Sequence, residues 1–84
     1  MLAEYEKLVQ LADELSRQSA VCGEVIEVII NGIYHGRVKW HPKIITAVIS
    51  AIMEIQYAIE LEQRLIEARK AFLAWLIDRD NGIH

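Results

Sequence analysis

The sequence has few of the residues that interrupt regular structure or cross-link a chain. Its 84 residues include one proline, four glycines and one cysteine, and aromatic residues make up only 7%. So little proline and glycine excludes a collagen-like chain, low-complexity disorder and a turn-rich β-sandwich. A lone cysteine cannot form an intramolecular disulfide, so Cys22 is interpreted as a small apolar residue in a reducing compartment. A cytoplasmic location is therefore expected.

Aliphatic residues are abundant instead. The hydrophobic fraction is 54%, above the roughly 45–50% of soluble chains. The net charge of -3 argues against general nucleic-acid binding. The acidic, amphipathic start of the chain is unlike a signal peptide. Residues 44–61 are about long enough to span a bilayer, but Glu54, Gln56 and Glu60 interrupt them, which favours a buried helix and no membrane partner.

Apolar and polar residues recur every three or four positions over most of the chain, which predicts α-helix. The pattern predicts one domain over residues 1–84, with helices over about 2–33 and 43–80 and a connection over 34–42. Gly32 and Gly36 suit the end of the first helix, and Pro42 suits the first turn of the second. The expected fold is an all-α antiparallel helical hairpin. Gly23 leaves open whether the first helix is continuous or kinked.

The second helix is apolar around most of its circumference, so one partner helix cannot cover it. Leaving three or four large aliphatic side chains in water would forfeit about 1.5–3 kcal/mol for each. The hairpin is therefore expected to assemble into a homo-oligomer of the four-helix-bundle type, a dimer or larger. The residues expected at the oligomer interface are Ile45, Val48, Ile49, Ile52, Ile55 and Ile59.

Three carboxylates are candidate metal ligands. Glu24 and Glu27 share a face of the first helix, and folding the hairpin near residue 38 brings Glu54 within about one turn of Glu24. Carboxylates that face one another in a bundle would favour a divalent cation such as Mg²⁺. The same three residues also fit the solvated polar stripes of the two helices, so both interpretations stay open.

Four short runs resemble a known family: CGEVIE at 22–27, IYHG at 33–36, HP at 41–42 and AIEL at 58–61. They look like phage-type MazG-like proteins, all-α nucleoside triphosphate pyrophosphohydrolases. In that family an ExxE pair and an ExxD pair bind Mg²⁺ for cleavage between the α- and β-phosphates. Residues 24–27 have the form of the first pair. The second pair is expected near residues 51–54, where the chain has Ala51 and Glu54, so one of its two ligands is missing. Ala20 and Val21 stand where the family has glutamates, so the resemblance implies this fold with a depleted acidic site.

The connection between the helices is basic and aromatic. Together with Lys43, the first residue of the expected second helix, it carries three of the nine basic residues and no acidic one, which leaves six basic against twelve acidic residues elsewhere. The positive end of the following helix dipole also favours an anion there. A nucleotide, a phosphate or an acidic protein surface would suit it, or else it is a solvated loop whose Trp40 covers the end of the bundle. The candidate binding residues are Tyr34, His35, Arg37, Lys39, Trp40, His41 and Lys43.

Two functions follow as hypotheses. The first is a small non-catalytic, homo-oligomeric binding or inhibitory protein, of the kind that phages and mobile elements encode, which holds a nucleotide or a host protein and needs no cofactor. The alternative is a minimal Mg²⁺-dependent nucleoside triphosphate pyrophosphohydrolase that uses Glu24, Glu27 and Glu54. That enzyme would need a further carboxylate, from Glu60 or from another protomer, to complete its metal shell.

Overall fold

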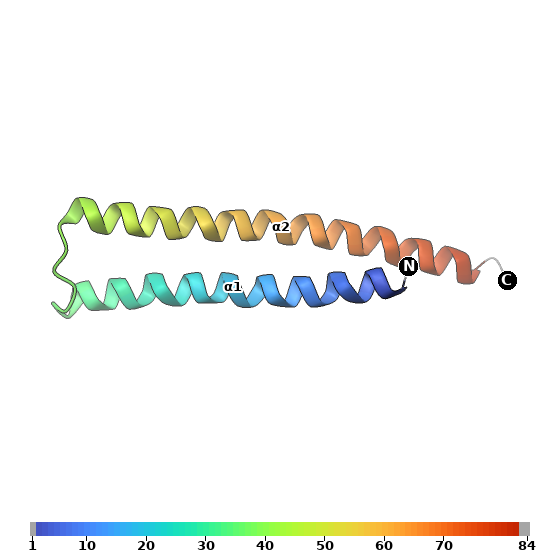
Figure 1. Cartoon of the computed structure of the whole chain (residues 1–84), viewed down its shortest axis with the longest axis horizontal. Coiled ribbons are helices and arrows are strands. Elements are labelled where there is room, and N and C mark those ends of the chain that lie inside the picture. Colours follow the sequence, from blue (N-terminus) through green and yellow to red (C-terminus); the bar gives the residue numbers. More distant parts are fainter. Residues whose placement is uncertain (1, 83–84) are drawn as a thin grey trace.

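The chain forms a long antiparallel helical hairpin (Figure 1). A computed structural model describes residues 2–82, with side chains through residue 80. Helix α1 covers Leu2–Tyr34 and helix α2 covers Pro42–Gly82. The predicted all-α hairpin is confirmed, with helix boundaries within about two residues of those expected, while residues 1, 83 and 84 of the predicted domain lie outside the described part. The molecule measures 66 × 17 × 15 Å, and α1 runs through Gly23 without a break.

Helix α1 ends in a glycine-dependent cap. Gly36 has a φ of 73°, a left-handed conformation that side chains with a Cβ rarely adopt. This turn lets the Arg37 N–H donate to the Gly32 carbonyl at 2.7 Å and the Gly36 N–H donate to the Ile33 carbonyl at 3.1 Å. These two bonds form a Schellman motif, which satisfies carbonyls that the helix itself cannot pair. The Val38 N–H donates to the same Gly32 carbonyl at 3.0 Å, so the loop folds back on the helix end.

Helix α2 begins with a side-chain cap. His41 precedes Pro42, the first helical residue, and its Nδ1 accepts a hydrogen bond from the Lys43 N–H at 3.1 Å. The His41 carbonyl accepts from the N–H groups of Ile44 and Ile45 at 2.8 and 3.1 Å. Proline has no N–H to satisfy and its fixed φ suits the first turn. The N–H groups of the first turn of α2 are thus all satisfied by His41, and these local hydrogen bonds define where the helix begins.

The two helices meet along one stripe each, which we call the inner seam. Its positions alternate in steps of three and four residues, the heptad spacing of coiled coils. Every residue of the inner seam is buried or half-buried. The seam consists of Tyr5, Leu8, Ala12, Leu15, Ser19, Cys22, Ile26 and Ile29 on α1, and of Ile45, Ile49, Ile52, Gln56, Ile59, Gln63, Ile66, Lys70, Leu73 and Ile77 on α2.

Two glutamines of the inner seam hold the register between the helices. Gln56 donates from Nε2 to the Ser19 carbonyl oxygen at 3.4 Å, and Gln63 donates from Nε2 to Ser16 Oγ at 3.1 Å. Each bond joins the two helices at one register, so a shifted register would lose both bonds, each worth about 0.5–1.5 kcal/mol.

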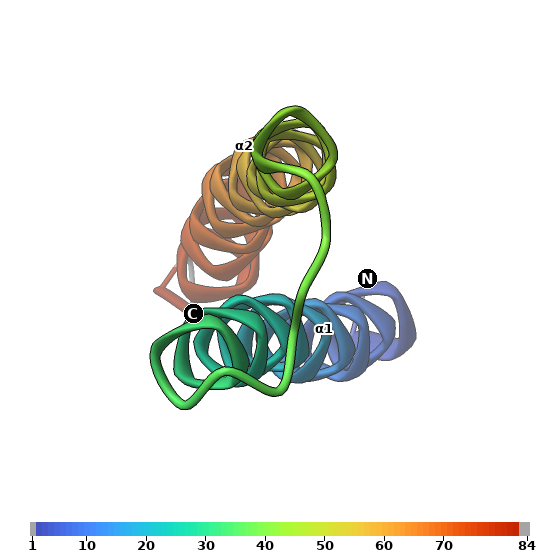
Figure 2. The same ribbon diagram turned by 90° about the vertical axis from the view of Figure 1, so that its left-hand side faces the viewer.

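The tightest packing lies at the open end of the hairpin, far from the loop. Leu8, Ile66 and Leu73 form the buried cluster there, with Tyr5, Ala12, Leu15 and Leu76 packed around them. Figure 1 shows the two ribbons drawn closer together at this end, and Figure 2 shows that the helices cross at an angle. In the loop-proximal half, Ile29 is the one large hydrophobic side chain among residues 18–61 that is buried. Two helices alone therefore make a core only at one end.

Candidate functional site

A second pair of stripes lies beside the inner seam, on one side of the hairpin, and we call this surface the groove face. It also follows heptad spacing, so it runs the length of both helices. Two shallow grooves place the stripes of α1 and α2 side by side: Gln18 and Val21 line one groove with Ile55, and Glu4 and Lys7 line the other with Phe72. The groove face consists of residues 4, 7, 11, 14, 18, 21, 25, 28 and 32 on α1, and of 44, 48, 51, 55, 58, 62, 65, 69, 72, 76 and 79 on α2.

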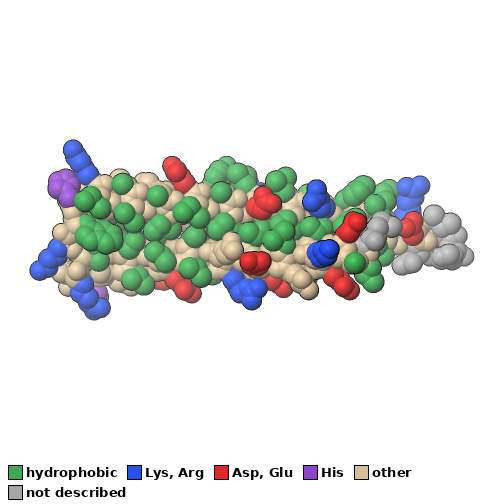
Figure 3. All heavy atoms as spheres, viewed as in Figure 1, with side chains coloured by type: hydrophobic (Ala, Val, Ile, Leu, Met, Phe, Trp, Pro, Cys, Tyr) green, Lys and Arg blue, Asp and Glu red, His purple; other side chains and the backbone are tan. Residues whose placement is uncertain are grey.

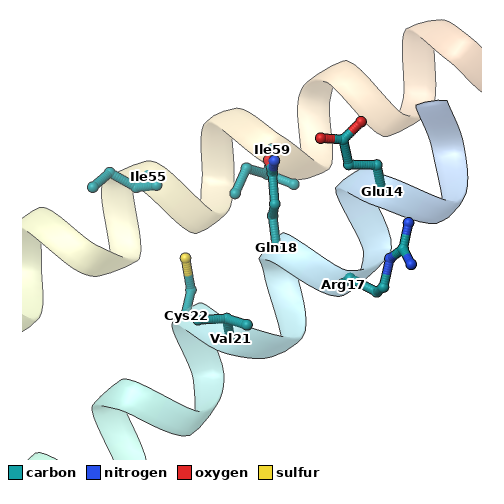
Figure 4. Close-up of a pocket in the computed structure, with 7 residues that line it drawn as sticks. All are labelled: Glu14, Arg17, Gln18, Val21, Cys22, Ile55 and Ile59. Carbon is teal, nitrogen blue, oxygen red and sulfur yellow. The ribbon is translucent and has the colours of Figure 1, made fainter.

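Figure 4 shows the groove nearest the middle of the hairpin. Ile55 and Ile59 lie on the α2 wall, and Gln18 extends from α1 toward them. Cys22, half-buried on the inner seam, points its sulfur toward the space between the helices. The groove is open and most of its exposed surface is apolar, so it offers contact area to another helix. Its lining residues are Glu14, Arg17, Gln18, Val21, Cys22, Ile55 and Ile59.

The groove face divides into two halves of different character. The half near the loop contains no charged residue, and we call it the uncharged half; it consists of Gln18, Val21, Val25, Val28, Gly32, Ile44, Val48, Ala51, Ile55 and Ala58. The other half, the charged half, holds three acidic and three basic residues among apolar ones; it consists of Glu4, Lys7, Leu11, Glu14, Glu62, Leu65, Arg69, Phe72, Leu76 and Arg79.

Large hydrophobic side chains are exposed along this face. Ile55 is 54% exposed and Val28 is 68% exposed, both within the uncharged half. Figure 3 shows hydrophobic side chains gathered over both helices in the loop-proximal part of the molecule. Contiguous apolar surface of this kind marks interaction sites. The groove-face residues with large exposed hydrophobic side chains are Leu11, Val21, Val25, Val28, Ile44, Ile55, Leu65 and Phe72.

The six residues expected at an oligomer interface fall on two different surfaces. Ile45, Ile49, Ile52 and Ile59 are half-buried on the inner seam, where they face α1 of the same chain. Val48 and Ile55 lie on the groove face. Sequence reasoning did not separate these stripes because both are aliphatic and they are neighbours on the helix. The heptad spacing does not separate them either, because both stripes follow it and differ only by a shift of one residue.

The candidate metal ligands point away from both the inner seam and the groove face. Glu24, Glu27 and Glu54 are all exposed, and their heptad positions place them on the outer surfaces of the two helices. Among the residues that the structure describes, no three His, Cys, Asp or Glu side chains lie close enough together to hold a metal ion. A single copy of the chain thus does not bring these carboxylates together.

The basic-aromatic loop forms the tip of the hairpin, and all seven predicted binding residues are exposed there. Tyr34 is 85% exposed and packs edge-to-face on His35, with ring centroids 5.2 Å apart. Figure 3 shows the basic and histidine side chains projecting at this end. Trp40 is 47% exposed, so it does not cover the end of the helix pair fully. The structure brings these residues to one end of the molecule.

The tip differs from expectation in one respect. The sequence suggested that free N–H groups at the start of α2 help to hold an anion, but the N–H groups of Lys43, Ile44 and Ile45 already donate to His41. An anion at the tip would therefore depend on the side chains of Arg37 and Lys39, and of Lys43, rather than on these N–H groups.

By length and composition alone, α2 also passes the criteria for a membrane-spanning helix. An 18-residue window within Pro42–Asp80 has a mean hydropathy of 1.6. Core helices of soluble proteins reach the same values, so this property by itself does not identify a membrane protein.

Comparison of the chain with protein families, with curated proteins and with solved structures finds no match in any of the three. The two surfaces of the molecule that can bind a partner are the groove face and the tip.

Proposed function

We propose that this protein is a small, non-catalytic binding protein that assembles with itself through the groove face and presents its basic-aromatic tip to an anionic partner. The observation that carries the proposal is the row of exposed large hydrophobic side chains along the groove face. The tip's partner would be a nucleotide or an acidic protein surface, because three basic side chains and two aromatic rings lie together there without an acidic neighbour in the loop.

The energies favour covering the groove face. Eight large hydrophobic side chains on this face are more than a third exposed. Full burial contributes about 1.5–3 kcal/mol for each such side chain. Covering even half of the apolar surface that is still exposed on both copies therefore yields on the order of 10 kcal/mol or more. Association costs about 4–15 kcal/mol in lost freedom and ordering. A second hairpin, which would complete a four-helix bundle, therefore supplies stabilisation of the required size.

Covering this surface with a lipid bilayer would cost more free energy than covering it with a second hairpin. Glu54 and Glu60 are exposed within the apolar stretch of α2, and Glu24 and Glu27 are exposed on the neighbouring part of α1. A charged side chain at the centre of a bilayer costs at least about 2.5–3.5 kcal/mol. A partner helix on the groove face leaves all four carboxylates in water, because they lie on other faces of the hairpin.

Two matched substitutions test the assembly. Ile55 on the groove face and Met53 on the opposite side are 54% and 57% exposed, and they lie two residues apart on α2. Ile55→Lys should weaken self-association by about a hundredfold or more, since each copy loses about 1.5–3 kcal/mol of apolar burial. Met53→Lys should leave self-association nearly unchanged. Sedimentation equilibrium of both variants and of the unchanged chain measures the dissociation constants.

Three outcomes would contradict the proposal. The unchanged chain could sediment as a monomer at micromolar concentration, or the two lysine variants could weaken association equally. The chain could also float with neutral lipid vesicles and remain with them at high salt, which would indicate that lipid covers the apolar surface.

A further inference from the structure

We infer that two copies pack groove face to groove face with their loops at the same end of the bundle, so that both basic tips form one composite surface. This inference rests on the proposed self-assembly and adds its geometry. The occupant of the groove face is a second copy of this chain, and three features of the described residues together lead to the same-end orientation: the size of the face, its charge distribution and the exposure of the tip charges.

The first feature is the size of the face. Helix α1 has 33 residues, which corresponds to a length of about 50 Å, and the molecule is about 17 Å wide. The full groove face therefore offers a footprint of about 800 Å² per copy, the size of a standard stable interface. Overlap of only one half would bury about half of that, below the roughly 1,000 Å² total that a stable interface needs. The two hairpins must then overlap along their whole length.

The second feature is the distribution of charge along the face. With full overlap, an opposite-end arrangement packs the uncharged half of each copy on the charged half of the other. Six charged side chains per copy would then lose water against aliphatic side chains, with no ionic partner on the other copy, which is costly. In the same-end arrangement the two uncharged halves meet each other. The charged halves also meet, and each carries three acidic and three basic residues, so both signs are present for pairing.

The third feature is that the electrostatic repulsion between the two basic tips, which opposes the same-end arrangement, is weak. Bringing two tips to one end places like charges near each other, namely Arg37, Lys39 and Lys43 of both copies. These side chains are exposed, and salt screens exposed charges beyond about 8–10 Å at physiological ionic strength. The desolvation of six charged groups per copy therefore outweighs the repulsion between solvated tips.

The same-end arrangement has a consequence for binding. Six basic side chains and two copies of Trp40 would lie at one end of the bundle, so an extended anionic partner could contact both copies at once. Two linked contacts bind more tightly than either contact alone when both sites are reachable together. The ligand surface of the tip is then complete only in the dimer.

Spin labels on two exposed positions of α1 test the orientation. Gln10 and Asn31 share the outer stripe of α1, away from the inner seam and the groove face, so labels there leave both contacts intact. Each is changed singly to cysteine in a Cys22→Ala background, and distances between labels are measured by pulsed electron resonance. Sedimentation equilibrium on the labelled proteins confirms the dimer independently.

The two orientations predict opposite orders of distance. In the same-end dimer the two labels at position 31 lie at the same height along the bundle axis and are separated only across it. A label at position 10 and one at position 31 on the partner are then about 30 Å apart along the axis. In the opposite-end dimer the two labels at 31 are about 40 Å apart along the axis, and the mixed pair lies nearly level. Same-end distances support the inference. Opposite-end distances in a proven dimer overturn it while self-assembly stands, and a monomer overturns both.

Discussion

Replacing two glycines of α1 by alanine should change the free energy of unfolding in opposite directions. Both residues are inside the helix, where alanine is favoured over glycine by about 0.8–1.0 kcal/mol. At Gly23 the nearest neighbour of an added Cβ is Gln56 Nε2 at 3.8 Å, an ordinary contact. Gly23→Ala should therefore stabilise the protein by about 0.5–1 kcal/mol.

At Gly32 the added methyl group meets the loop. Its Cβ would lie 2.5 Å from Val38 Cγ2 and 3.5 Å from Val38 Cβ, and Val38 is held by its N–H bond to the Gly32 carbonyl. Valine has little rotamer freedom, so the loop backbone must move. Overpacking of this kind costs about 1–3 kcal/mol. After the gain in helix propensity, Gly32→Ala should still be less stable than Gly23→Ala by about 2 kcal/mol.

Urea denaturation followed by circular dichroism, at one protein concentration, measures both effects. The concentration must be fixed because self-association adds to apparent stability. The double variant Gly32→Ala with Val38→Ala should recover part of the loss, since the clash needs both side chains. Equal stabilisation by both single alanine variants, with no coupling to Val38, would refute the close approach of the loop to Gly32.

Two further predictions concern the tip. His41→Ala should destabilise the protein by about 0.5–2 kcal/mol in the same denaturation assay, because the Lys43 N–H loses its cap, while His41→Asn should preserve stability because asparagine caps well; equal loss in both would argue against capping. In a thermal-shift screen, a nucleotide at a hundred times its dissociation constant should stabilise the dimer by about 2.7 kcal/mol without Mg²⁺, and Lys39→Ala should reduce that shift. A shift that required Mg²⁺ and was lost in Glu54→Gln would instead favour the pyrophosphohydrolase.

The helices themselves could be predicted from the sequence for clear physical reasons. Proline at 42 and glycines at 32 and 36 mark the break because each imposes a local backbone restriction or freedom that helices use at their ends. The polar residues that recur at helical spacing on α1, such as Glu6, Gln10 and Asp13, are exposed. Local rules were sufficient there, since helix ends and polar faces depend on residues close in sequence.

Which apolar stripe of α2 forms the inner seam could not be predicted in the same way. Ile45 and Ile44 are adjacent and equally apolar, yet Ile45 is half-buried toward α1 and Ile44 is 53% exposed. On α2 the apolar stripes merge, so periodicity alone does not say which one meets α1. Gln56 and Gln63 further obscure the inner seam because they are polar residues at inward positions, satisfied by partners on α1. Such partners lie far away in sequence, and only the folded hairpin brings them together.

The order of the residues was enough to predict the helical class, the position of the loop and an excess of aliphatic surface that two helices cannot bury. Those properties depend on composition and on spacing within one element. The packing of α2 against α1 places Glu24, Glu27 and Glu54 on outer faces and makes the uncharged half of the groove face continuous across both helices. It does so because the loop, the cap at Gly36 and the glutamine contacts fix the rotation and register of α2 against α1, which no single helix specifies.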